Sequence, residues 1–415
     1  MFKKVSSLLF VTTAAISINS YADQSSLVRG QSVYDRERPD YDSRGVNLGA
    51  FTLNPSLNVQ QTYDDNIFAT DGDEVEDNIT RVKPGLNLKS DWSRHEVSVG
   101  ASGDFGFHYD NDNENYEDYN LNANARVDLL RETYLYGGVF FDQLHEDRGS
   151  ADDVNGVDPT EYTVLQGNLG FYKGLRRFTL KVDGSAREID FDDVLTSGSS
   201  LINNDDRDRK ILEGSVRVGY EIVPNYEAYV RGTINQRDYD EDTDDNGINR
   251  DSDGYEAVIG TALDISGKVR GDIYLGYLRQ EFDSSALSDA DGIGFGANVL
   301  WNATSLTSLK ARVDRSIDET TINNASSYIN TGVGLTLEHE LRRNVLTSLN
   351  LSYALNDYEG IAREDDFIIA NPEIRYLINR NVSVSADYNY AERESNVVNQ
   401  DYKNHQFTVG LKLAL

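Results

Sequence analysis

The chain repeats one cycle nine times: an alternating apolar and polar stretch, a long acidic segment, a second alternating stretch and a short turn. In residues 95–109, Val97, Val99 and Phe105 fall on one parity, whereas Ser98 and Asp104 fall on the other. A period of two is typical of a β-strand with one apolar and one polar face. Because the cycle continues to the last residue, it predicts an all-β, closed antiparallel transmembrane barrel.

Residues 1–22 have the features of a secretory signal peptide. Lys3 and Lys4 form the charged region, residues 5–18 the apolar region, and residues 20–22 a small-residue cleavage site. We therefore expect export, with the mature chain beginning at Asp23 and residing in the outer membrane of a Gram-negative bacterium. No other run approaches the length of an apolar membrane helix, so a barrel is the membrane-spanning structure that the sequence allows.

The rest of the chain divides into two parts. Residues 23–48 are polar and lack periodicity, which predicts a periplasmic N-terminal tail, and residues 49–415 carry the barrel pattern. Nine long loops and eight short turns alternate along the barrel region, which predicts about 18 strands with long acidic extracellular loops and short periplasmic turns. The last strand should close against the first, because an unpaired strand edge cannot lie in lipid.

Composition excludes several classes of function. The formal net charge is −31, and removal of Lys3 and Lys4 makes it −33, which argues against nucleic acid as a partner. The absence of cysteine excludes disulfides, thiolate metal sites and a cysteine nucleophile. The five histidines have neither metal-like spacing nor a neighbouring nucleophile motif, so we expect no catalytic residues and no enzyme activity.

The inward parity of the predicted strands is strongly polar. A barrel of this size encloses a water-filled lumen unless something plugs it. Its side chains could exchange hydrogen bonds with sugar hydroxyls, and tyrosine rings could stack on pyranose rings; a solvated wall held by cross-strand ion pairs is the alternative. The candidate lumen-lining residues are Asn122, Arg126, Lys181, Arg187, Arg217, Tyr229, Arg231, Arg270, Tyr274, Lys310, Arg312 and Arg375.

Both tryptophans indicate the orientation of the barrel. Trp92 and Trp301 each close a descending strand just before a short turn. Interfacial aromatic girdles belong at that height, so we expect both side chains to contact outer-membrane lipid on the periplasmic side.

The outer loops carry a candidate calcium site. Asp242, Asp244, Asn246 and the following glycine match the first half of a calcium loop, and Asp253 falls at its twelfth position. The twelfth residue is Asp rather than Glu, and no helices flank the segment. Diffuse bridging of divalent ions between the acidic loops and lipopolysaccharide is the alternative, and no other cofactor is expected.

A glycine-rich segment superficially resembles a dinucleotide loop. In residues 292–296 the glycines alternate with Ile293 and Phe295 inside a predicted strand, and no helix follows. The pattern therefore indicates a strand rather than a nucleotide site.

Residues 36–95 carry motifs that go beyond the barrel pattern: R-E-R-P-D-Y-D at 36–42, Y-D-D-N-I-F at 63–68 and S-D-W-S-R-H at 90–95. They resemble a family of outer-membrane β-barrel porins encoded with bacterial exopolysaccharide and capsule synthesis genes. The resemblance implies an 18-stranded barrel that passes a polysaccharide across the outer membrane together with a periplasmic polysaccharide-export protein. It supplies no catalytic residues, and the motifs are expected to serve the barrel mouth and the first hairpin.

Three functions remain open from the sequence. The first is a passive conduit that exports an exopolysaccharide of the biofilm or slime type. The second is a general or sugar-selective diffusion porin. The third is a closed surface receptor or adhesin whose acidic loops seal the lumen.

Overall fold

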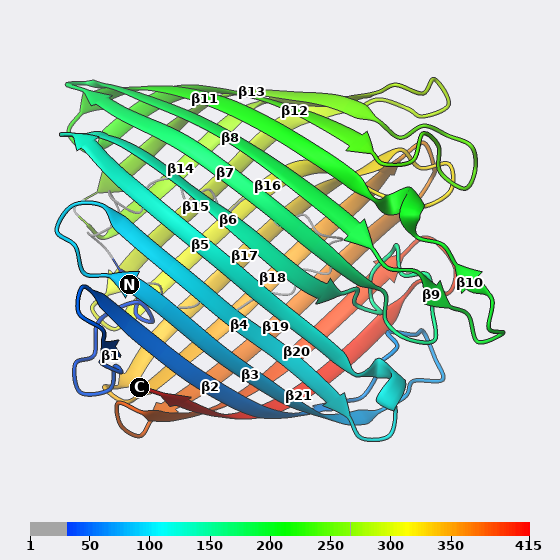
Figure 1. Cartoon of the computed structure of the whole chain (residues 1–415), viewed down its shortest axis with the longest axis horizontal. Helices are drawn as coiled ribbons and strands as arrows, with labels where there is room; N and C mark the ends of the chain where they lie inside the picture. Colours follow the sequence, from blue (N-terminus) through cyan, green and yellow to red (C-terminus); the bar gives the residue numbers. More distant parts are fainter. Residues whose placement is uncertain (1–30, 266) are drawn as a thin grey trace.

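The computed structural model describes residues 31–265 and 267–415, so the expected signal peptide and the start of the tail lie outside the described residues. Eighteen strands form a closed antiparallel barrel (Figure 1). They are β2 (Phe51–Asp64), β3 (Asp77–Ser90), β4 (Glu96–His108), β5 (Tyr116–Leu130), β6 (Thr133–His145), β7 (Glu161–Leu175), β8 (Phe178–Phe191), β11 (Arg209–Val223), β12 (Tyr226–Tyr239), β13 (Ser252–Ile265), β14 (Val269–Phe282), β15 (Ala290–Thr304), β16 (Thr307–Glu319), β17 (Ser327–Arg342), β18 (Val345–Glu359), β19 (Glu364–Leu377), β20 (Val382–Ser395) and β21 (Tyr402–Ala414).

The barrel closes between its first and last strands, as the sequence predicts. β2 pairs with β21 from Ser56 opposite Ala414 to Asp64 opposite Gln406. Along the wall, apolar side chains face outward and polar ones inward. In β5, for example, Leu121 and Val127 are exposed, whereas the asparagines between them are partly buried. This alternation suits a wall with lipid on one side and water on the other.

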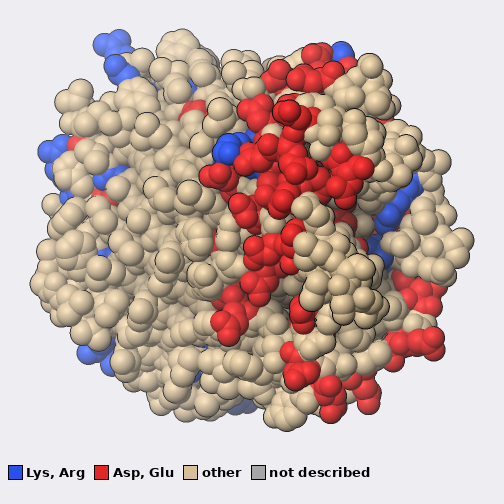
Figure 2. Space-filling view, turned by 45° about the vertical axis from the view of Figure 1, so that its right-hand side comes forward, with Lys and Arg blue, Asp and Glu red and all other residues tan. Residues whose placement is uncertain are grey.

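The two ends of the barrel differ. Short turns join the strands at one end and long loops at the other, as predicted (Figure 1). Acidic side chains gather over the loop end (Figure 2). Small elements that the sequence pattern does not predict decorate the connections: β1 (Val46–Asn47), β9 (Val194–Leu195), β10 (Leu201–Ile202) and the short 3-10 helices η1 (Asp112–Glu114) and η2 (Asp205–Arg207).

No helix in the described part of the chain is long and apolar enough to cross a membrane.

Buried apolar side chains form small clusters rather than one continuous core. Val164, Ile189 and Phe191 form one cluster on the inward parity of β7 and β8, close to the loop end. A second cluster joins strands on the far side of the barrel and contains Leu278, Ala290, Ile317 and Ile329. These clusters lie near the loop ends of their strands, so apolar side chains pack inside the barrel at this end.

Candidate functional site: the lumen and its two ends

A row of amides lies along the inner face of β5. The side-chain amide of Asn122 donates to Asn120 Oδ1 at 2.7 Å, and Asn124 donates to Asn122 Oδ1 at 3.4 Å. Asn120 in turn donates to Asp142 Oδ1 at 2.6 Å. All three asparagines are partly exposed, and each amide has more donor and acceptor positions than these contacts use. The row is therefore a neutral track that can exchange hydrogen bonds along the lumen.

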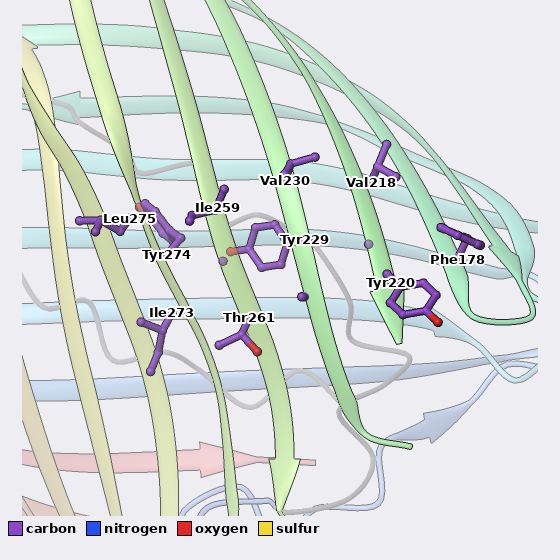
Figure 3. A pocket seen from close by; sticks show the side chains of 13 residues that line it. Phe178, Val218, Tyr220, Tyr229, Val230, Ile259, Thr261, Ile273, Tyr274 and Leu275 are labelled. Atoms are coloured by element: carbon purple, nitrogen blue, oxygen red, sulfur yellow. The ribbon is translucent and has the colours of Figure 1, made fainter. Parts of the chain in front are cut away.

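Inward tyrosines lie flat on the wall, with a glycine beneath and an arginine above. A Cβ added at Gly260 would clash with the ring of Tyr229, and one added at Gly296 would clash with the ring of Tyr274. The Arg217 guanidinium lies 3.6 Å from the Tyr229 ring centroid. Figure 3 shows Tyr229 on β12 and Tyr274 on β14, two strands that have β13 between them. Glycine thus provides the flat surface on which each ring packs.

This packing changes the expected role of Tyr229. Its side chain is only 3% exposed, and its hydroxyl donates to Asp272 Oδ1 at 2.6 Å. The ring has a glycine on one side and Arg217 on the other, so it offers no free face to a pyranose. The expectation of sugar stacking is wrong at this position, because strand glycines let the ring lie against the wall.

The predicted lumen-lining arginines and lysines lie on the inner wall, and most of them contact an acidic side chain. Arg217 contacts Glu227 at 2.7 Å and Asp272 at 3.2 Å, and the three side chains are 21–32% exposed. Their main effect is to hold the charges in place. The remaining contacts are Arg126–Asp128, Lys181–Asp183, Arg187–Gln166, Arg231–Glu256, Arg270–Asp264, Lys310–Glu338, Arg312–Asp314 and Arg375–Glu373.

Adding one methyl group beneath Tyr229 should disturb this wall. We expect Gly260→Ala to lower the free energy of unfolding by about 1–3 kcal/mol, since the ring must leave its packed position. Urea unfolding of the barrel in lipid vesicles measures the change. Gly334→Ala is the matched control, because a Cβ there meets only Arg312 Cβ at 4.0 Å. Equal stability of both variants would contradict the packing role of Gly260.

At the turn end, residues 31–44 lie against the inner wall. The backbone N–H of Val33 donates to Ser308 Oγ at 2.9 Å, and that of Tyr34 donates to Glu338 Oε2 at 2.9 Å. Arg375 lies over the Tyr34 ring at 5.0 Å. The segment therefore follows β16, β17 and β19 across the periplasmic mouth.

The arginines of the R-E-R-P-D-Y-D motif hold this segment in place. Arg38 is 2% exposed, contacts Glu340 at 3.0 Å and donates to the carbonyl oxygen of Val33 at 2.7 Å. Arg36 donates to the carbonyl of Ser305 and to Asn302 Oδ1. The motif thus serves the barrel mouth. The periodicity of the sequence could not locate its partners, which are about 300 positions away.

At the loop end, the β6–β7 loop (residues 146–160) crosses the lumen. It begins at the end of β6, and the carbonyl of Gly149 accepts a hydrogen bond at 3.0 Å from Arg393 on β20, six strands away around the barrel. Asp152 Oδ1 accepts hydrogen bonds from the Thr320 hydroxyl at 2.6 Å and from the Thr321 N–H at 3.1 Å. Ala151 packs against the cluster that contains Tyr328. The loop therefore bridges strands that lie half a circumference apart.

Buried charges fix the first half of this crossing loop. Glu146 and Arg207 form a bidentate pair at 2.7 and 2.9 Å, with side chains only 5% and 4% exposed. Arg148 contacts Glu114 at 2.8 Å and Asp153 at 3.5 Å. Burial raises the pKa of Asp153 to about 6 despite the nearby Arg148. Keeping the Asp153 carboxyl group inside the barrel therefore carries a desolvation cost.

The candidate calcium ligands are not gathered around one point. Asp244 contacts Arg250 at 2.8 Å and accepts hydrogen bonds from the N–H groups of Asn246 and Ile248, which lower its pKa although burial opposes them. Asp253 lies inside β13, opposite Gln236. Asp242 is exposed, and no group of three acids or histidines in metal-binding geometry occurs within 31–265 and 267–415. The Asp244 carboxylate is thus paired with Arg250 rather than grouped with the other candidate ligands.

Both tryptophans lie at the turn end, as expected from the sequence. Trp92 follows β3 and Trp301 lies near the end of β15; their exposed fractions are 46% and 47%. Trp92 packs edge-on against Phe51, with ring centroids 5.5 Å apart. Two half-exposed indoles at the turn end fit an interfacial girdle.

Solved structures of outer-membrane proteins from Pseudomonas aeruginosa resemble this barrel at low identity. OpdK is 13% identical with a TM-score of 0.42, over 88% of this chain and 99% of that one. OccK3 (OpdO) is 17% identical with a TM-score of 0.44, over 88% and 96%. A mutant of the ferric enterobactin receptor PfeA is 7% identical with a TM-score of 0.48, over 88% and 80%.

Sequence families give a more specific assignment. No curated protein matches the chain. The family model described as "Putative beta-barrel porin 2" matches residues 38–415, from the buried Arg38 of the N-terminal segment to the last residue. The chain therefore belongs to this porin family and is a porin-like channel of the Gram-negative outer membrane.

Proposed function

We propose that the barrel is a passive conduit through which an exopolysaccharide leaves the cell. The observation that carries this proposal is the row of neutral amides at Asn120, Asn122 and Asn124. Amides exchange hydrogen bonds with hydroxyl groups without holding them as strongly as unpaired charges would. Weak, repeated contacts suit a conduit, because the cargo must enter and also leave.

The state of the two ends supports an exporter that opens on demand. Residues 31–44 cover part of the periplasmic mouth, and residues 146–160 cross the outer end. An 18-stranded barrel that stayed open would let small solutes pass continuously. A periplasmic polysaccharide-export protein, implied by the sequence resemblance, is the proposed partner that displaces the inner segment.

Deletion of the gene tests the proposal. We expect loss of extracellular polysaccharide from the deletion strain and recovery when the native chain is supplied. A barrel with Asn120, Asn122 and Asn124 replaced by leucine should insert normally but restore much less polysaccharide. Unchanged surface polysaccharide after deletion would refute the proposal.

A diffusion porin is the second candidate, and the paired charges of both signs on the inner wall favour it. Fixed charges of opposite sign along a water-filled lumen suit the passage of small polar solutes without a polymer. This function predicts slower uptake of small sugars by the deletion strain, with normal polysaccharide. Measuring uptake and polysaccharide in the same strain separates the two candidates.

A further inference from the structure

The ladder between the neighbouring strands β15 and β16 covers only part of their length. β15 pairs with β14 as far as Ala290, and β16 pairs with β17 as far as Glu319. The ladder between β15 and β16 runs only from Thr304–Thr307 to Gly296–Asp314. Within the described chain, residues 290–295 of β15 therefore have no strand partner on that side.

The loop end of the β16–β17 hairpin lies inside the barrel. Ile317 and Ile329 share the outward parity of Val313 and Leu335, and that parity faces lipid lower in the same strands. Yet Ile317 is 7% and Ile329 4% exposed. Both pack in one cluster with Leu278 and Ala290, which are on the inward parity of β14 and β15. The outward face of the hairpin thus covers the inward face of its neighbours.

Charged groups on the inner wall hold the hairpin in this tucked position. Glu319 contacts Arg209 on β11 at 2.5 Å and Arg237 on β12 at 3.7 Å. Arg237 also donates to the carbonyl oxygen of Ile317 at 2.8 Å. Arg250 donates to the carbonyls of Thr320 and Ala325 at 2.8 and 3.1 Å. The hairpin end therefore reaches far enough into the lumen to meet strands four and five places away.

The glycine-rich segment 292–296 makes room for the hairpin. Gly292 and Gly294 are on the inward parity of β15, so no side chains project from them toward the hairpin. The Arg315 guanidinium lies 3.9 Å from the position that a Cβ of Gly292 would occupy. In the pattern that superficially resembles a nucleotide loop, Gly292 thus leaves space for the Arg315 side chain of the hairpin.

We propose that the β16–β17 hairpin end is a gate with two positions. In the tucked position it narrows the lumen and meets the crossing loop through Thr320 and Asp152. In the second position it returns to the wall and continues the β15–β16 ladder, with Ile317 opposite Ile293. Ile317 and Ile329 then face lipid, the free edge of β15 gains a partner, and the lumen widens. This gate does not depend on which cargo the barrel carries.

Disulfide trapping in the intact barrel tests the gate, and the chain has no native cysteine to interfere. The pair Ile293→Cys with Ile317→Cys traps the wall position, since directly opposed strand residues can be bridged. The pair Ala290→Cys with Ile329→Cys traps the tucked position. After oxidation in planar bilayers, we expect the wall-trapped barrel to conduct at least about two-fold more than the tucked-trapped one. Reduction should remove the difference.

A point variant of the native chain gives an independent test. Glu319→Gln should raise conductance, because it weakens the contacts with Arg209 and Arg237. Glu281→Gln is the matched control, since Glu281 also lies at the loop end of a strand and contacts an arginine, but is half exposed. The proposal is overturned if the wall pair does not cross-link in folded barrels, if both trapped barrels conduct equally, or if Glu319→Gln behaves like Glu281→Gln.

Discussion

Replacing residues 148–157 with a Gly-Gly link should raise the single-channel conductance of the purified barrel about five-fold, because the bare lumen of an 18-stranded barrel is wide. These residues carry the contacts that cross the lumen, namely the Gly149 carbonyl with Arg393 and Asp152 with Thr320. The strands β6 and β7 remain paired up to His145 and Glu161, so the wall should stay intact. Planar-bilayer recordings before and after the replacement measure the effect.

A point variant separates loop release from damage to the barrel. Glu146→Gln leaves Arg207 buried without its ionic partner, and losing one partner of a buried pair costs about 3–5 kcal/mol. We expect Glu146→Gln to raise the single-channel conductance, as the loop replacement does. Glu188→Gln is the matched control, because the Glu188–Lys210 pair is about half exposed. Unchanged conductance in both loop variants would show that the crossing loop does not limit the lumen.

Acidification from pH 7.5 to pH 5 should reduce the open fraction of the channel about ten-fold, since one pKa unit corresponds to 1.36 kcal/mol. In the closed loop, burial raises the pKa of Asp153 to about 6, whereas a loop released into water would have an ordinary carboxyl. The closed form therefore binds the proton more tightly, and it gains stability as the pH falls through 6. Above that value the closed form loses this contribution.

The variant Asp153→Asn identifies the group responsible. It should keep the loop closed at both pH values and remove most of the pH dependence of conductance. The charges around Asp153 are Arg148, which opposes its protonation, and Glu146 and Asp147, which favour it. Asp208 has a similarly raised pKa, so Asp208→Asn is measured in parallel. A native pH response in Asp153→Asn would assign the effect to another group.

Strand positions could be predicted from the sequence because their signal is local. Leu121 faces lipid and its neighbour Asn122 faces the lumen. The sequence of β5 shows this alternation of apolar and polar residues directly. The loops and turns follow from where the alternation stops. The inward placement of residues such as Arg217 and Arg231 follows from the same parity.

The features that close the lumen have no such local signal. Ile317 has the parity of a lipid-facing residue, and only its contacts with Leu278 show that it is inside. Arg38 holds the N-terminal segment because it contacts Glu340, which lies about 300 positions later. The Tyr229 ring is unavailable to a sugar because of Gly260 on a neighbouring strand. Each of these depends on pairing between distant segments, which periodicity does not encode.

The docking of residues 31–44 also has a consequence for the order of barrel assembly. The segment precedes the first strand, yet the groups that hold it belong to β16, β17 and β19. Residues 31–44 can reach their final position only after these late strands have folded into the wall. Seating of Arg38 against Glu340 is therefore among the last steps of folding, and it ties the beginning of the chain to strands that complete the cylinder.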